Sequence, residues 1–521
     1  MGQAAVKWPQ VEDVGAFVLP VAEAVGRLKG LERLTVRGVS VLCALPLAHG
    51  KGRTRFPLVL VPDAAGLQGS LVEMSRLLAS TRETQACILA MVDAAVDDAG
   101  LLGEIVTACE ARFRVRPDTC ALLAHGAHVE TTLHRYIEGI GGITRCIVAS
   151  AQPCSILSAF APRPALSLAW TTRAEPPAAL RARSDVRWKT MPEAADAVLP
   201  VCGLLHGLRA FWSRPHRYGD EVLPLTRPTV SALARALAPA LRPLTRRPQF
   251  AAAQGNRFVL RAQAMQRDFE IFVAPPARLV AGRRAPAVLA LDANGGFATV
   301  AETAARLAAA GEIEDSFVIG VGTPRAQGEL EFGFRRFEEL SPPPPSGYRY
   351  DDRLGHLFRA LYALRGQDAR QQLGQAPAFH AFLARQLMPE LCAQWPIDVA
   401  RLSLLGHSAA GTFVAYALAQ PDTPFANFVC LSPGVAISGH WMLVQPALPA
   451  RAAPRRIYAA IGAEERDNPF NIVSGIPETP MYLQKLRVPG LRCEVLDGET
   501  HSTVYPRAVA QGLRAVLAPN R

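Results

Sequence analysis

The strongest constraint on the fold is an ordered similarity between the two halves of this 521-residue chain. Segments 56–66 and 285–295 are each an apolar run that ends in a Gly-containing turn and is followed by a helical pattern. Segments 118–128 and 400–410 align without a gap, and in each a second apolar run enters a turn of small residues. Strand, turn and helix in this order are typical of a mostly parallel sheet covered by helices. The sequence therefore predicts the same α/β fold twice.

Further pairs of segments keep the same order along both halves. Two alternating runs precede the long apolar strand in each half, at 34–36 and 41–45 and again at 257–260 and 269–273. Such runs indicate two antiparallel strands that lead into the sheet. Any two α/β domains share some of these patterns, but their common order and comparable spacing favour a duplication.

The chain length and the proline distribution set the expected boundaries. A chain of 521 residues is too long for one ordinary core. We predict a first domain at 1–215, a Pro-rich linker with one helix at 216–250 and a second domain at 251–521. A second Pro-rich stretch, 341–348, is expected to form an extended loop over the site of the second domain.

Composition excludes several classes of function. No segment approaches the roughly 18 to 20 apolar residues of a membrane span, and a cytoplasmic location is expected. The ten cysteines are scattered without a C-x-x-C pair, which favours buried thiols over a disulfide framework or a zinc site, so neither a metal nor another cofactor is expected. The net charge of +11 is spread along the chain without aromatic-interleaved basic runs. This distribution favours a solvated, Arg-rich surface over a nucleic-acid site, and a small anionic substrate remains the alternative.

The turn at 406–410 has the chemistry of a nucleophile. Ser408 lies at its apex, flanked two residues away by Gly406 and Ala410. A serine that is presented from a strained strand-to-helix turn needs small residues at those positions. The pattern is short, so a structural serine remains the alternative.

A serine nucleophile needs a base, an acid and donors for the oxyanion. His501 follows a strand-like run, 493–496, and precedes the helical pattern 504–517, where the base is expected. The acid is expected in the loop after strand 456–462, and we favour Glu465, although the sequence does not choose among three candidates: Glu464, Glu465 and Asp467. The expected oxyanion donors are the backbone N–H groups of Ala409 and of Ala293 or Asn294.

The first half lacks two of these residues. Gly126 stands where Ser408 stands in the second half, and Ala195 stands where His501 stands. We therefore expect a degenerate, non-catalytic domain with a structural or regulatory role, such as homodimerisation.

Residues 251–521 resemble the esterase family that includes the bacterial siderophore (enterobactin and salmochelin) esterases, within the α/β-hydrolase superfamily. The resemblance rests on L-D-A-N-G-G-F at 291–297, R-R-F-E-E-L-S-P at 335–342, the serine turn, L-S-P at 431–433 and His501. The chain departs from the family where Ala293 and Ala410 replace glycines and where Trp441 lies further from the L-S-P segment.

The resemblance implies two tandem α/β-hydrolase-like domains, each a mostly parallel, doubly wound sheet flanked by helices. It also implies hydrolysis of a carboxylic ester, such as a catechol-type or other polyanionic molecule. The implied substrate-binding residues are Arg335, Arg336, Trp441 and His407, although adjacent arginines on one element cannot both face a pocket. A thioesterase, a feruloyl-like esterase and a non-catalytic binding or assembly protein remain alternatives.

Overall fold

The protein is described by a computed structural model in which two compact units are resolved. The structure describes residues 30–213 and 257–519, with gaps at 47–48, 50–52, 82, 154–155, 157–166, 280–281, 325–326, 445–455, 468–478, 481–482 and 484–489. The predicted linker at 216–250 lies outside the described residues, so its helix and the domain boundaries remain predictions.

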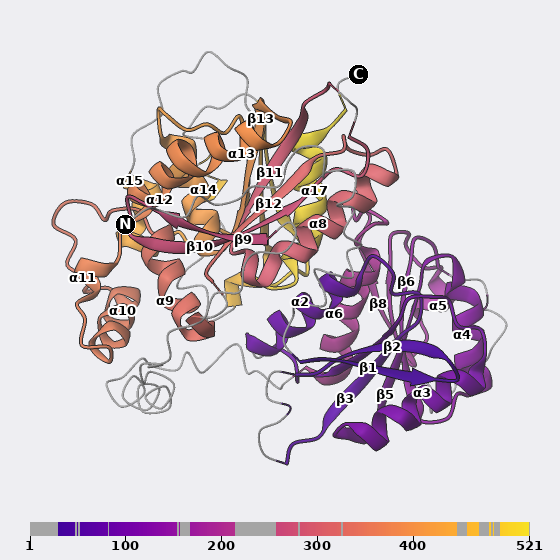
Figure 1. Cartoon of the computed structure of the whole chain (residues 1–521). Helices are drawn as coiled ribbons and strands as arrows, with labels where there is room; N and C mark the ends of the chain where they lie inside the picture. The colour runs from indigo at the N-terminus through magenta and orange to yellow at the C-terminus, as the bar shows by residue number, and fades with distance from the viewer. Residues whose placement is uncertain are drawn as a thin grey trace. The chain divides into compact units, whose positions relative to one another are not determined.

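The first unit is an eight-stranded sheet (Figure 1). Its strands are β1 (Leu31–Val36), β2 (Val39–Ala44), β3 (Phe56–Val61), β4 (Ile88–Val92), β5 (Val115–His125), β6 (Ile143–Ser150), β7 (Leu168–Thr172) and β8 (Val186–Thr190). Its helices are α2 (Gln68–Ser80), α3 (Ala99–Arg112), η2 (Gly126–His128), α4 (Val129–Glu138), α5 (Ala178–Arg181) and α6 (Leu199–Trp212). The strand order is β1-β2-β4-β3-β5-β6-β7-β8; the β1–β2 and β2–β4 pairs are antiparallel, and the other pairs are parallel.

The second unit contains the same sheet with longer connections. Its strands are β9 (Arg257–Ala262), β10 (Arg267–Ala274), β11 (Ala285–Leu291), β12 (Phe317–Gly322), β13 (Ile397–His407), β14 (Asn427–Leu431), β15 (Ile457–Gly462) and β16 (Leu491–Leu496). Its helices are α8 (Ala293–Ala309), α9 (Gly328–Leu340), α10 (Arg353–Ala363), α11 (Ala369–Gln372), α12 (Ala376–Phe382), η5 (Leu383–Leu387), α13 (Met388–Gln394), α14 (Ala409–Ala419), α15 (Ile437–Val444), η6 (Ala463–Asp467) and α17 (Val504–Leu517). The order β9-β10-β12-β11-β13-β14-β15-β16 repeats that of the first unit strand for strand.

The duplication extends to the pairing register. Leu58 pairs with Cys120 in the first sheet as Ala287 pairs with Leu402 in the second, at the positions that the sequence alignment predicts. Both sheets also have a register shift one step earlier, between residues 56 and 58 and between residues 285 and 287. The prediction of two tandem α/β-hydrolase-like domains is confirmed.

Close packing of the last helix also recurs. A Cβ atom on Gly207 of α6 would lie 2.5 Å from the Ile147 side chain on β6. A Cβ atom on Gly512 of α17 would lie 2.5 Å from Val429, the residue on β14 at the position of Ile147. Each glycine lets the helix approach the sheet more closely than any side chain would allow.

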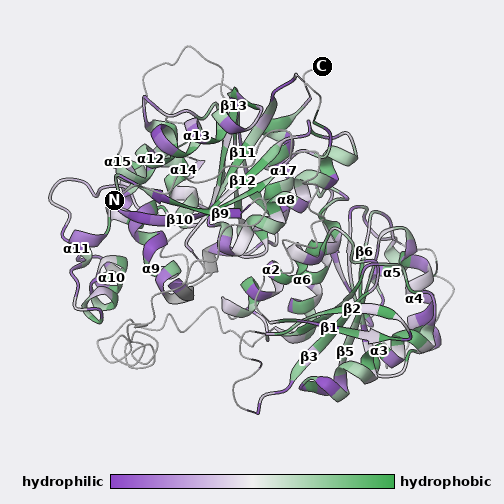
Figure 2. Cartoon of the chain, in the orientation of Figure 1, coloured by the Kyte–Doolittle hydropathy of each residue, from purple (hydrophilic) through white to green (hydrophobic). Residues whose placement is uncertain are grey.

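The central strands are apolar because helices cover both faces of each sheet. All residues of β3 and all but the first residue of β11 are buried, and Figure 2 shows these strands as hydrophobic ribbons with polar residues on the outer helices. Parallel strands that are buried on both faces read as continuous apolar runs. That is the pattern on which the sequence prediction rests.

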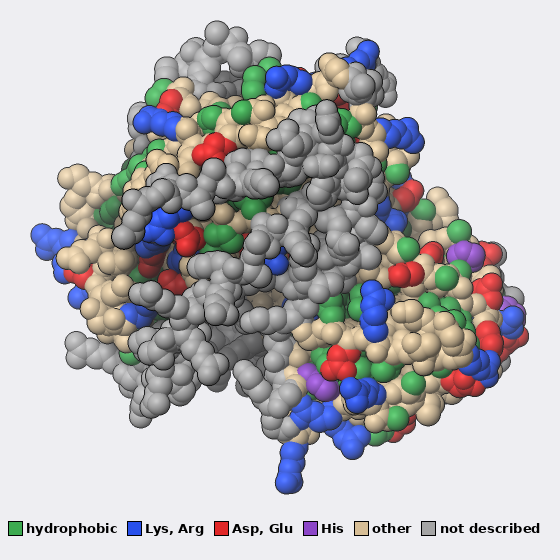
Figure 3. Space-filling view, in the orientation of Figure 1, with side chains coloured by type: hydrophobic (Ala, Val, Ile, Leu, Met, Phe, Trp, Pro, Cys, Tyr) green, Lys and Arg blue, Asp and Glu red, His purple; other side chains and the backbone are tan. Residues whose placement is uncertain are grey.

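The surface and the helices agree with the compositional expectations. On the face drawn in Figure 3, the described basic and acidic side chains are interspersed. No helix among the described residues is long and apolar enough to cross a membrane. The cysteines in the described part of the chain are free thiols, most of them buried. The predicted loop at 341–348 contains neither helix nor strand.

Candidate active site

The turn that carries Ser408 lies between β13 and α14. Ser408 adopts φ 62° and ψ −123°, a backbone conformation with positive φ that is costly for a residue with a side chain. Its N–H donates to the Leu431 carbonyl (3.0 Å), and its own carbonyl accepts from the N–H groups of Thr412 (3.1 Å) and Gly434 (3.3 Å). Neighbouring strands and helix therefore hold the strained backbone from both sides.

Small residues around the serine are required by close backbone contacts. A Cβ atom on Gly406 would lie 2.4 Å from the Ala410 carbonyl oxygen, and one on Gly411 would lie 2.6 Å from the Leu431 carbonyl oxygen. Helix α14 itself is apolar and is buried from Ala409 to Leu418. The turn can thus form only where the chain supplies glycine and alanine.

Two helix N-termini meet at the carboxyl edge of the second sheet. Strands β11 and β13 are parallel neighbours, and the chain leaves them for opposite sides of the sheet. Such a switch point is where open α/β sheets form their ligand crevices. Helix α8 begins at Ala293 and α14 begins at Ala409, and the first N–H groups of a helix have no acceptor within it. Backbone donors from two adjacent strand ends are therefore available at this edge.

The side chain of Asn294 connects two elements next to these donors. Its Nδ2 donates to the Thr323 carbonyl (2.6 Å), and its Oδ1 accepts from the Thr323 N–H (2.7 Å). Asn294 thus ties the start of α8 to the end of β12, which leaves its backbone N–H as the candidate oxyanion donor.

Glu465 and His501 form a buried pair on the next strands of the same edge. His501 Nδ1 lies 2.8 Å from Glu465 Oε2, and both side chains are almost completely buried. Glu465 Oε1 accepts from Ser432 Oγ (2.5 Å) and from the Gly462 N–H (2.8 Å). Because the carboxylate can only accept, the proton of this contact is assigned to His501 Nδ1.

The three acid candidates differ in placement. Glu465 faces the base, whereas the adjacent Glu464 is exposed. The side chain of Asp467 lies outside the described residues. Of the two carboxylates whose side chains are described, only Glu465 contacts His501.

His407 connects the serine turn to the histidine. Its Nε2 donates to the His501 carbonyl oxygen (2.8 Å), and its ring lies 4.6 Å from the His501 ring and 5.1 Å from the Tyr505 ring. Burial lowers the pKa of His407 to about 3, so its imidazole is neutral near pH 7. These contacts are to the protein's own groups, and the expected role of His407 in substrate binding stays a prediction.

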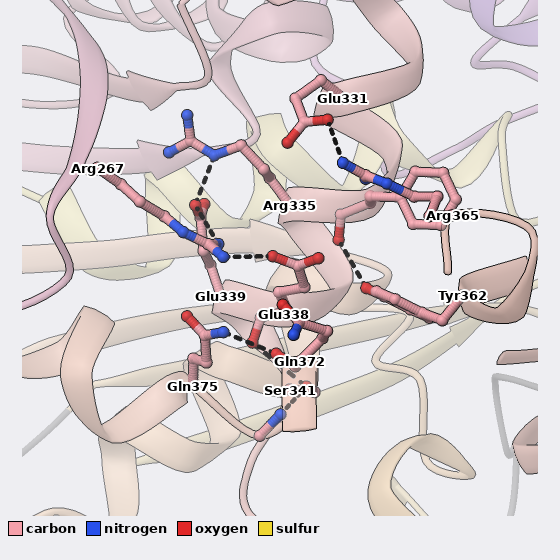
Figure 4. Close-up of polar contacts among 12 residues, drawn as sticks. Arg267, Glu331, Arg335, Glu338, Glu339, Ser341, Tyr362, Arg365, Gln372 and Gln375 are labelled. Atoms are coloured by element: carbon pink, nitrogen blue, oxygen red, sulfur yellow. Dashed lines mark hydrogen bonds and ion pairs between the residues drawn. The ribbon is translucent and has the colours of Figure 1, made fainter. Parts of the chain in front are cut away.

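Arg335, another residue expected to bind substrate, lies in the interior. Its side chain is 3% exposed. Its Nε donates to Glu339 (2.7 Å), its Nη1 donates to Gln327 (2.7 Å) and the Asp268 carbonyl, and its guanidinium lies over the Phe269 ring. Figure 4 shows this arginine inside a network of ion pairs on α9. Arg335 therefore anchors α9 in the interior, and its expected role in substrate binding stays a prediction.

Of the other two residues expected to bind substrate, Arg336 is partly exposed and Trp441 is buried. Arg336 directs Nη2 and Nε to one carboxylate oxygen of Asp292, at 2.6 and 3.1 Å, and about a fifth of its side chain is exposed. Trp441 is buried on α15 with its ring 5.4 Å from that of Tyr416. Arg336 reaches the turn before α8, whereas Trp441 packs against α14 within the core.

Sequence reasoning did not assign roles to Ser432 and Asp292. Ser432 holds the carboxylate of Glu465, and Asp292 adopts a left-handed backbone conformation and pairs with Arg336. Both follow directly after an apolar strand, at the carboxyl edge where polar side chains concentrate. That position is the signal that could have found them.

The first unit lacks the corresponding groups. Gly126, at the position of Ser408, keeps a positive φ of 68°. Ala195, which aligns with His501, is buried. Strands β7 and β15 are equivalent in the two sheets, and Leu168 aligns with Ile457. Counted from this pair, Pro176 stands at the position of Glu465. The first unit thus has neither nucleophile, base nor acid at the three positions.

The sheet topology, the strained serine turn at the switch point and the buried carboxylate–histidine pair define an α/β-hydrolase-like unit, and this C-terminal half resembles the siderophore esterases. Among curated proteins, the chain is similar to the ferri-bacillibactin esterase BesA of Bacillus subtilis (strain 168), with 24% identity over 266 residues, which cover 49% of this chain and 86% of the relative.

Two solved structures are similar to about half of the chain. The BES protein from Bacillus cereus has 18% identity and a TM-score of 0.40, over 53% of this chain and 100% of that chain. The siderophore hydrolase EstB from Aspergillus nidulans has 18% identity and a TM-score of 0.42, over 53% of this chain and 98% of that chain. No model of a known protein family matches the sequence.

Proposed function

We propose that the second unit is a serine esterase in which Ser408 is the nucleophile, His501 the base and Glu465 the acid that orients it. The observation that carries the proposal is the buried Glu465–His501 pair, which lies at the same sheet edge as the strained turn of Ser408. Two donors hold Oε1 of Glu465, and Oε2 faces the imidazole of His501.

The chemistry follows from these positions. Ser408 Oγ attacks the ester carbonyl while His501 Nε2 takes its proton, and Glu465 stabilises the imidazolium that forms. The N–H groups of Ala409 and of Ala293 or Asn294 stabilise the oxyanion. His501 then protonates the departing alcohol, and water, activated by the same histidine, releases the acyl group from Ser408.

The substrate is proposed to be a siderophore-type or other polyanionic ester. The support is the similarity to a ferri-bacillibactin esterase over nearly the whole length of that relative. The net charge of +11 would assist encounter with an anionic molecule. A role of the first unit in homodimerisation stays a prediction.

The test compares the wild type with Ser408→Ala on p-nitrophenyl butyrate and on a catecholate siderophore ester. We expect turnover and fluorophosphonate labelling by the wild type, and the loss of both in the variant. Equal hydrolysis by the two proteins, or no labelling of Ser408, would reject the serine mechanism and favour a non-catalytic binding protein.

A further inference from the structure

The turn between β11 and α8 is held by an ion pair as well as by its backbone. Asp292 adopts φ 55° and ψ 38°, the left-handed conformation, immediately before the first N–H groups of α8. Arg336 approaches this side chain from α9 with two nitrogens on one carboxylate oxygen. The pair therefore lies next to the proposed oxyanion donors and fixes the direction of the Asp292 carboxylate.

The helix that carries Arg336 is itself anchored. Arg335 and Glu339 pair in the interior, and Arg267 of β10 bonds to both Glu338 (2.6 Å) and Glu339 (3.2 Å) (Figure 4). Successive residues of a helix point about 100° apart, so anchoring Arg335 turns Arg336 to a different face. The guanidinium of Arg336 is thus presented from a rigid helix, at a defined place.

The first unit provides an internal comparison without this arginine. Asp63, at the position of Asp292, has the same left-handed backbone with φ 57°. The connection that contains α9 in the second unit, residues 323–396, is replaced there by the short segment 93–114, which forms α3. No ion pair of Asp63 is found within the described ranges. A Cβ atom on Gly126 would lie 3.6 Å from Asp63 Oδ2.

The position of the Asp63 carboxylate can be compared with that of Asp292. In the first unit it lies in contact distance of the apex of the turn, at the position that Ser408 occupies in the second unit. A negative charge at that place would oppose the negative charge that develops on the ester oxygen during attack. In the second unit the corresponding carboxylate is bonded to Arg336 instead.

We propose that Arg336 is a positioning residue that holds the Asp292 carboxylate away from Ser408 and keeps the adjacent turn, with its oxyanion donors, in the reactive geometry. The proposal rests on the serine-esterase function. It differs from direct substrate binding by Arg336, because it requires an effect on esters that carry no charge.

The experiment measures kcat and KM on p-nitrophenyl butyrate, a neutral ester, for Arg336→Ala, Arg336→Lys, Asp292→Asn and the double variant. Asparagine tolerates the left-handed backbone and removes the charge. The matched control is Arg365→Ala, which removes the ion pair between Arg365, just after α10, and Glu331 of the same helix as Arg336, without touching Asp292. Thermal melting verifies that each variant is folded.

We expect Arg336→Ala to lower kcat by about 10- to 100-fold with little change in KM, since misplaced donors and a repelling charge act in the transition state. Asp292→Asn in the Arg336→Ala background should restore most of this loss, and Arg336→Lys should be intermediate. The control should stay within about twofold of the wild type.

Two results would overturn the positioning role: unchanged kcat of Arg336→Ala on the neutral ester, or a double variant as slow as Arg336→Ala. A rise in KM confined to anionic esters would assign Arg336 to substrate binding instead. These results leave the serine mechanism intact, because the Ser408→Ala comparison tests it separately. If the wild type shows no Ser408-dependent turnover, both proposals fail. Should Arg336→Ala not fold, Arg336→Lys with and without Asp292→Asn decides the question.

Discussion

Replacing Glu465 by glutamine tests the proposed triad most sharply. Glu465 Oε1 accepts from Ser432 and from the Gly462 N–H, and Oε2 faces His501 Nδ1. In Glu465→Gln the amide oxygen must stay with the two donors, so the amide NH2 group faces His501. Nδ1 must then accept, and the proton moves to Nε2, which can no longer take a proton from Ser408.

The size of the effect follows from these contacts. The variant loses a charge-assisted bond to the imidazolium, worth about 1.5 to 3 kcal/mol, or roughly 10- to 150-fold in rate. The wrong tautomer adds to this loss, and we expect kcat to fall by about 10³- to 10⁴-fold in total. The variant keeps the shape of the side chain and removes a buried charge, so its melting temperature should not fall appreciably.

The assay is steady-state hydrolysis of p-nitrophenyl butyrate, with Glu464→Gln as the matched control. Glu464 is the exposed neighbour, and its variant should stay within about twofold of the wild type. The reasoning is refuted if Glu465→Gln retains turnover within about tenfold of the wild type, or if both variants lose activity equally.

Three further perturbations are predicted. Burial lowers the pKa of His407 from 6.5 to about 3, so the unfolded chain binds more protons than the folded chain between these pH values. The free energy of unfolding should therefore fall by up to about 5 kcal/mol as the pH drops from 6.5 to 3. Chemical denaturation of the wild type and of His407→Gln measures this, and the same dependence of the free energy of unfolding on pH in both proteins would contradict it. Gly406→Ala, whose Cβ would lie 2.4 Å from the Ala410 carbonyl, should destabilise the protein by about 1 to 3 kcal/mol or more and abolish turnover, measured by melting and by esterase assay. Introducing Gly126→Ser with Ala195→His into Ser408→Ala should produce no fluorophosphonate labelling, since the acid is still missing; labelling of residue 126 would show that the reasoning on the first unit is wrong.

The fold could be predicted from the sequence because its signals are local and repeated. The apolar runs at 56–61 and 285–291 form strands that are buried on both faces, as the central strands of a parallel sheet covered by helices must be. The gapless alignment of 118–128 with 400–410 fits the observed register, because the strands that lead into both turns have equivalent pairings, β3 with β5 and β11 with β13. The acid could not be chosen in this way. Glu464 and Glu465 are adjacent, and which of them is buried depends on the 3-10 turn of η6.

The assignment of the arginines shows a second limit of sequence reasoning. Arg335 and Arg336 are chemically identical and adjacent, so their pattern predicts only that they face different ways. Their roles depend on partners far along the chain: Arg335 bonds to the Asp268 carbonyl and lies over the Phe269 ring, whereas Arg336 pairs with Asp292. Such partners become visible only when the three-dimensional arrangement is known.

The positive φ angles at Gly126 and Ser408 have a thermodynamic consequence. A positive φ occurs at the corresponding position of both units, yet only in the second is it adopted by a residue with a side chain. A backbone conformation with positive φ costs such a residue about 1 to 3 kcal/mol, whereas glycine adopts it freely. The unit that we propose to be non-catalytic therefore also lacks this backbone strain. One chain thus holds a strained and a relaxed version of the corresponding turn, so the free-energy cost of the strained backbone at Ser408 can be measured against an internal reference.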